Sequence, residues 1–139
     1  MEPFIPDLQS SLLCDDVRQE RNGKFILIGL FDVLAVPRFP SVFQRVCIVN
    51  RWCCGLGEFN QKSRLLKPDG DTLMIEGKEV TVTLPDNEAT ATSVEFFLNV
   101  KFETEGTYWV EILLDRDIKV RYPLKAKQVT GQGQGPGQA

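Results

Sequence analysis

Acidic side chains in the N-terminal third are the first residues in this sequence whose types and spacing could do chemistry. Asp15 and Asp16 are adjacent, and Asp32 follows in the same part of the chain. Paired carboxylates can hold a divalent cation or serve as general acid and base, which would indicate a metal-dependent or carboxylate-based hydrolase. Neighbouring side chains of an extended strand point to opposite faces, however, which separates Asp15 from Asp16. We therefore favour the interpretation that these acids cap turns or pair with Arg18 and Lys24.

A second group of acids falls in two expected turns, Asp69-Gly70-Asp71 and Asp86-Asn87-Glu88. Their oxygens could bind calcium if the two loops meet at one end of the fold. Calcium needs roughly six to eight oxygen ligands, and the complete Asp-x-Asp-x-Asp-Gly loop is absent from the sequence. Asp, Asn and Gly are ordinary turn residues, so we interpret both tracts as turns and predict no metal site.

The cysteine and histidine content excludes several classes of enzyme. The chain has four cysteines, Cys14, Cys47, Cys53 and Cys54, and no histidine. Ser-His-Asp and Cys-His arrangements are therefore impossible. A zinc site would need all four thiolates, including an adjacent pair that cannot easily share one tetrahedron. We predict buried, free thiols and no cofactor.

The segment Arg51-Trp52-Cys53-Cys54-Gly55-Leu56-Gly57 could anchor a protein interface, because Trp and Arg are common anchors. A tryptophan buried in the core of a β-sandwich explains the same pattern equally well. The two glycines lack the third glycine and the helix of a dinucleotide-binding loop, so we expect no nucleotide site.

The overall charge argues against nucleic acid as a partner. The formal net charge is −3, and the Lys and Arg residues are scattered instead of forming a basic stripe. The first residues, Met-Glu-Pro-Phe-Ile-Pro-Asp, do not resemble a signal peptide. No apolar run approaches the roughly 18 residues of a membrane-spanning helix. We expect a cytoplasmic protein with no membrane contact.

The C-terminal half has the period of two that is typical of strands. From residue 94 to 102 apolar side chains occupy every second position, which predicts that Phe96 and Leu98 point inward and Glu95 outward. Two further runs, 108–114 and 118–124, form a hairpin across a short turn. In the first of these, Trp109 and Leu113 make the outward face partly apolar.

The N-terminal half contains a hairpin in which one strand is apolar on both faces. Residues 12–17 and 25–36 flank Asn22-Gly23, a strong hairpin signal. Phe25, Leu27 and Phe31 lie on one side of the second strand, and its other side is equally apolar. Such a strand must be covered twice, either by other elements of the chain or by a second subunit.

Further strands are expected at residues 43–54, 58–66, 72–76 and 79–84, each bounded by turn residues. About eight to nine short strands without a convincing helix predict an all-β, antiparallel β-sandwich, immunoglobulin-like in class. Residues 1–8 would be an N-terminal arm and residues 9–129 the sandwich domain. Residues 130–139, rich in Gly and Gln, would be a disordered tail.

Three short segments resemble a family of small bacterial proteins known mainly as an uncharacterised domain. They are Cys14-Asp15-Asp16-Val17-Arg18, Asn22-Gly23-Lys24 and Leu27-Ile28-Gly29-Leu30-Phe31, followed by Val36-Pro37-Arg38-Phe39-Pro40. The entry into the strand at Glu105-Gly106-Thr107-Tyr108 is similar to the closing hairpin of that family. The resemblance covers roughly residues 10 to 127. It implies a β-sandwich and supplies no activity, ligand or catalytic residue.

The sequence thus favours a non-catalytic binding or assembly module that associates with itself or with another protein. The alternatives are the carboxylate-based hydrolase and a carbohydrate- or peptide-binding sandwich with an aromatic platform around Trp52 or Trp109. For the favoured role, the candidate interface residues are Phe25, Leu27, Phe31, Trp52, Trp109 and Leu113.

Overall fold

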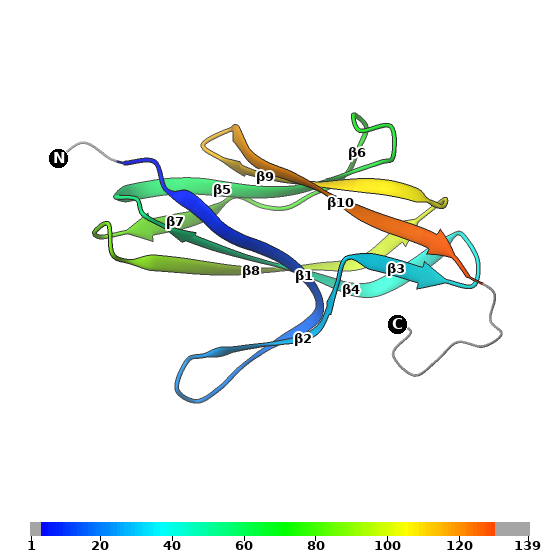
Figure 1. Cartoon of the computed structure of the whole chain (residues 1–139), viewed down its shortest axis with the longest axis horizontal. Helices are drawn as coiled ribbons and strands as arrows, with labels where there is room; N and C mark the ends of the chain where they lie inside the picture. Colours follow the sequence, from blue (N-terminus) through cyan, green and yellow to red (C-terminus); the bar gives the residue numbers. More distant parts are fainter. Residues whose placement is uncertain (1–3, 130–139) are drawn as a thin grey trace.

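The computed structural model describes residues 4–129 and contains, within that range, ten β-strands and no helix (Figure 1). The strands are β1 (Asp7–Gln19), β2 (Phe25–Phe31), β3 (Val33–Val36), β4 (Ser41–Cys53), β5 (Gly57–Leu66), β6 (Leu73–Glu76), β7 (Val80–Leu84), β8 (Thr90–Phe102), β9 (Gly106–Leu114) and β10 (Asp117–Gln128). The all-β prediction is confirmed. The expected tail of residues 130–139 lies outside the described residues, as do residues 1–3 of the expected arm. The rest of the expected arm packs against the domain, since Phe4 forms an antiparallel bridge with Leu56.

The strands form two sheets that pack against each other. One has four strands in the order β2-β1-β4-β8, and the other has six, with the order β3-β10-β9-β5-β6 and β7 paired to β5. The prediction of eight or nine strands was wrong because Asp32 interrupts the expected strand at 25–36, so β2 and β3 join different sheets. The purely antiparallel prediction also needs correction, since β3 pairs with β10 in parallel.

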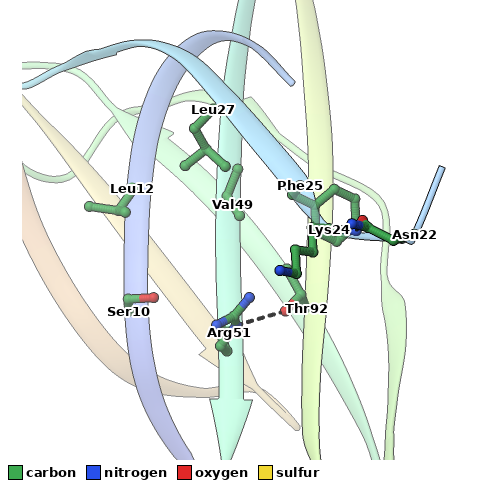
Figure 2. A pocket seen from close by; sticks show the side chains of 10 residues that line it. Ser10, Leu12, Asn22, Lys24, Phe25, Leu27, Val49, Arg51 and Thr92 are labelled. Carbon is green, nitrogen blue, oxygen red and sulfur yellow. Dashed lines mark hydrogen bonds between the residues drawn. The ribbon is translucent and has the colours of Figure 1, made fainter. Parts of the chain in front are cut away.

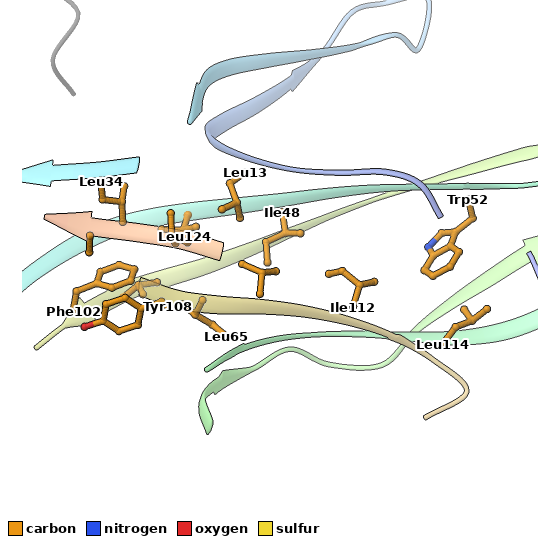
Figure 3. Packing of buried hydrophobic residues seen from close by; sticks show 14 of the residues in the cluster. Leu13, Leu34, Ile48, Trp52, Leu65, Phe102, Tyr108, Ile112, Leu114 and Leu124 are labelled. Carbon is orange, nitrogen blue, oxygen red and sulfur yellow. The ribbon is translucent and has the colours of Figure 1, made fainter. Parts of the chain in front are cut away.

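Large apolar side chains from both sheets meet in one continuous core (Figure 3). Trp52 lies at one end of this core, and Phe102 and Tyr108 lie at the other. The Phe102 and Tyr108 rings meet edge to face, with centroids 4.9 Å apart. Edge-to-face contacts of this kind add to the energy of apolar burial. The core therefore spans the length of the sandwich and holds the two sheets together.

A crease crosses the four-stranded sheet and changes which side chains face the core. Residues Asp15 and Gly29 are skipped in the β1–β2 register, and Gln44 and Asn99 are skipped between β4 and β8. Gly29 has a φ of 71° and Asn99 a φ of 55°, left-handed conformations that glycine and asparagine tolerate. Because both partner strands bend together, the pairing continues unshifted beyond the crease while the side chains change face.

The crease overturns the predicted faces of β8. Val100 and Phe102 are buried as expected, but Phe96 and Leu98 are exposed on the outer face. Glu95 instead points into the sandwich, where it accepts hydrogen bonds from Gln61 and Ser63 of β5. A period of two predicts faces only as far as the next left-handed residue, and Asn99 is such a residue.

Beyond the crease, β1 and β2 form a hairpin that leaves the sheet. Only Asp7 to Cys14 of β1 pair with β4, whereas Leu13 to Gln19 pair with β2. The hairpin therefore projects from the body of the molecule and lies over the outer face of the four-stranded sheet (Figures 1 and 2).

Candidate functional site

The space between the projecting hairpin and the sheet is a cleft of about 570 Å³. Figure 2 shows β2 crossing in front of β4 and β8, with Phe25 and Leu27 on the hairpin side and Val49 on the sheet side. Residues from four strands and from the hairpin turn line the cleft. They are Ser10, Leu12, Asn22, Gly23, Lys24, Phe25, Leu27, Val49, Arg51 and Thr92. Its volume lies within the range of about 300–1,000 Å³ that is usual for small-molecule sites.

A small second core fastens the hairpin to the sheet beside the cleft. Cys14, Cys47 and Val49 are buried on the outer face, and Leu27 and Val17 of the hairpin pack against them. Burial raises the pKa of the Cys14 thiol and raises the pKa of Cys47 to about 12. Both thiols therefore stay protonated at neutral pH, which makes them packing groups and not nucleophiles.

Two cations stand at one end of the cleft. Arg51 of β4 donates a hydrogen bond from Nε to Oγ1 of Thr92 at 2.9 Å, which directs the guanidinium along the sheet (Figure 2). Lys24 approaches from the hairpin turn, where Asn22 Oδ1 accepts a hydrogen bond from its backbone N–H at 3.0 Å. Within residues 4–129, neither cation forms an ion pair, and no acidic residue lines the cleft.

The predicted interface residues do not share one surface. Phe25 and Leu27 line the cleft, whereas Phe31 packs against the main core. Trp52 has an exposed fraction of 0% and belongs to the core. The prediction that it anchors an interface, and the alternative that it forms an exposed platform, were therefore wrong. Leu113 is also buried, because β9 is an inner strand between β5 and β10. The Arg121 guanidinium covers one face of half-buried Trp109 at 5.0 Å from the ring centroid.

Of the N-terminal acids, Asp16 is paired with cations, and one of them is Arg18, as the favoured interpretation predicted. Arg18 and Arg45 lie 2.9 and 2.7 Å from its carboxylate oxygens. The hydrogen bond from Arg18 is the main reason why the pKa of Asp16 is below its usual value. Asp15 lies over Gly29 at the crease, and Asp32 lies between β2 and β3. Among the described residues, no three Cys, Asp or Glu side chains are placed to hold a metal ion.

The two acidic loops use their oxygens to close turns. Asp69 accepts hydrogen bonds from the backbone N–H groups of Asp71 and Thr72 and from the Thr72 hydroxyl, and these bonds lower the pKa of Asp69 to about 2. Asp86 likewise accepts a hydrogen bond from the backbone N–H of Glu88. These contacts agree with the interpretation of both tracts as turns.

A buried acid on the outer face of the six-stranded sheet was not identified from sequence. Glu111 of β9 has its carboxylate 2.6 Å from Arg64 of β5 and 3.5 Å from Arg121 of β10. Because Arg121 also covers Trp109, the four residues form one continuous patch across three strands. The available signal was the alternation of β9, which puts Glu111 and Trp109 on the same face.

Sequence reasoning also missed a chain of polar side chains inside the sandwich. Trp52 Nε1 donates to Gln61 Oε1 at 2.7 Å, and Gln61 Nε2 donates to Glu95 at 3.1 Å. Ser63 also donates to Glu95 and accepts a hydrogen bond from Asn50 at 3.3 Å. In the sequence, only Asn50, a polar residue on an otherwise apolar strand face, hinted at this network. The network links the two sheets through hydrogen bonds at the level of Trp52.

Burial raises the pKa of Glu95, and the hydrogen bond from Ser63 opposes this effect only in part. The folded state therefore holds the Glu95 proton more tightly than the unfolded chain, so ionisation costs stability as the pH rises from about 4.5 through the folded pKa. We expect Glu95→Gln to be more stable than wild type at pH 7, with the difference disappearing near pH 4. Urea unfolding at both values measures it. An equal difference at both values would contradict the assignment.

Comparison with known proteins gives a family but no activity. Residues 9–127 match the model of a family described as "Family of unknown function (DUF6941)". No curated protein matches the chain. Within residues 4–129, there is no helix long and apolar enough to cross a membrane.

Proposed function

The chain belongs to this family of unknown function, DUF6941, and we propose that it is a non-catalytic assembly module that pairs with a second copy through the free edge of β2. The observation that carries the proposal is the character of this strand. β2 is the terminal strand of its sheet, so one row of its backbone N–H and C=O groups lacks a neighbouring strand in the described fold.

The side chains of β2 also favour a partner. Its sequence, Phe-Ile-Leu-Ile-Gly-Leu-Phe, contains none of the charges or prolines that normally protect an edge strand. Phe25 and Leu27 point towards the cleft, whereas Ile26, Ile28 and Leu30 are exposed, Leu30 to 60%. An exposed apolar edge of this length is typical of a surface that another strand covers.

The sequence around Ile28 is complementary to itself. In an antiparallel pair of β2 strands centred on Ile28, residues at equal distances from the centre face each other. Lys24 then lies across from Asp32 of the second copy. Opposite charges stabilise facing positions in antiparallel strands. This symmetry argues for a second copy as the partner, because a two-fold interface requires the same surface on both subunits.

We expect wild type to be a dimer at micromolar concentration and Ile28→Lys to be a monomer, because the substitution places two like charges across the two-fold axis. Light scattering coupled to size exclusion measures the mass. Ile118→Lys is the matched control, since Ile118 of β10 is exposed to 53% against 42% for Ile28 but lies on the other sheet.

The charge pair tests the register. Lys24→Glu should weaken the dimer, and Lys24→Glu combined with Asp32→Lys should restore it. A monomeric wild type, or a dimer that survives Ile28→Lys, would refute the proposal.

Two further proposals concern the class of the sandwich and the location of the protein. We infer an immunoglobulin-like sandwich because Tyr108 Oη donates to the backbone oxygen of Thr104 at 2.7 Å, a contact resembling the tyrosine corner of that class. We infer a cytoplasmic location because all four cysteines are free thiols, as expected in a reducing compartment.

A further inference from the structure

We propose that the cleft between the hairpin and the sheet binds a free amphiphilic carboxylate, an unbranched alkyl chain that ends in a single anionic head. The proposal goes beyond assembly and uses the opposite face of β2. Phe25 and Leu27 line the cleft, whereas Ile26 and Ile28 are exposed on the other side of the strand.

The apolar part of the cleft fits an alkyl chain. Leu12 and Val49 from the sheet and Phe25 and Leu27 from the hairpin supply its walls. These walls are hydrocarbon side chains, which offer no hydrogen-bond partner to a peptide backbone. A peptide would have to leave its backbone N–H and C=O groups unpaired against them, which is costly. An alkyl chain makes no such demand, so the cleft favours a ligand without a peptide backbone.

A cation at the end of the cleft is positioned to bind the anionic head. Arg51 lies at the mouth, and no acid among the described lining residues neutralises it. Thr92 accepts the hydrogen bond from Arg51 Nε, which leaves the terminal N–H groups of the guanidinium to meet a ligand. A guanidinium binds a carboxylate with two parallel hydrogen bonds. The arrangement therefore selects a molecule with an apolar body and one anionic end.

The first test titrates the full chain with sodium decanoate, below the concentration at which it forms micelles, by isothermal titration calorimetry. We expect one decanoate per chain, and an affinity about tenfold or more lower for 1-decanol, which has the chain without the charge. Arg51→Met should bind decanoate about as weakly as wild type binds 1-decanol. The preference for decanoate over decanol should therefore disappear. The control is Arg38→Met, which removes an exposed arginine outside the cleft and should leave binding unchanged.

Further variants separate the possible outcomes. Leu12→Trp should fill the cleft and abolish binding of both ligands. Ile28→Lys should keep binding, because that residue lies on the other face of β2, so failure of assembly and failure of the cleft can be told apart. Equal affinity for decanoate and decanol, or unchanged affinity in Arg51→Met, would overturn the proposal. Binding only to phosphatidylglycerol vesicles, with none to monomeric decanoate, would overturn it as well.

Discussion

The Trp52→Ala variant is expected to lose about 3–5 kcal/mol of stability, the usual cost of truncating a large buried aromatic residue. Trp52 is entirely enclosed, and its indole fills the end of the core between the two sheets (Figure 3). Its truncation also removes the hydrogen bond to Gln61, the residue that in turn holds Glu95. Urea unfolding followed by circular dichroism measures the loss, because this signal does not depend on the deleted fluorophore.

The other tryptophan is the control for this prediction. Trp109 is only half-buried and has Arg121 on one face, so Trp109→Ala should cost clearly less. Trp52→Phe should fall between the two, because it retains most of the apolar volume but no donor for Gln61. A Trp52→Ala loss no larger than that of Trp109→Ala would show that Trp52 is not a core residue.

Gly29→Ala is expected to lose about 2–4 kcal/mol of stability, a large effect for the addition of a single methyl group. Gly29 has a φ of 71°, and a Cβ placed there would overlap Oδ2 of Asp15 and lie 2.7 Å from its Cγ. The substitution therefore adds backbone strain to a direct overlap. Because Gly29 lies at the crease from which the hairpin projects, the variant should also lose affinity for decanoate.

Gly23→Ala separates the backbone strain from the overlap with a neighbouring side chain. Gly23 has a φ of 93° in the hairpin turn, but nothing lies within 4 Å of the position of its Cβ. It should therefore lose only the conformational part, about 1 kcal/mol. Denaturant unfolding of both variants measures the difference. If the two losses are equal, the contact between Asp15 and Gly29 does not shape the crease.

Local patterns predicted most of the strands because the signals for a strand and a turn lie within a few residues. Asn22-Gly23 predicted the first hairpin, and Asp115-Arg116-Asp117 predicted the turn between β9 and β10. The same patterns failed at Asp32 and Asn99. Asp32 divides one expected strand between two sheets, and the left-handed Asn99 reverses the faces of β8. The alternation of apolar and polar residues on either side of Asp32 and Asn99 gives no sign of the strand break or of the reversed faces.

The candidate cleft could be predicted only in part. The sequence identified Phe25 and Leu27 as members of an unusually apolar strand that needs to be covered on both faces. It did not place Arg51 or Thr92 beside them, because these residues are far apart in the chain and meet only where the hairpin lies over β4 and β8. Trp52 was left open between core and interface for the same reason.

By itself, the sequence determined the strand content, most of the turns and the absence of imidazole chemistry, since each depends on residue types within short segments. The tertiary structure alone decided which face of each strand is buried, which edge remains free and which side chains share the cleft. These properties depend on sheet order and on the direction of the strands beyond the crease. They arise from contacts between residues distant in the chain, whose energies no local pattern records.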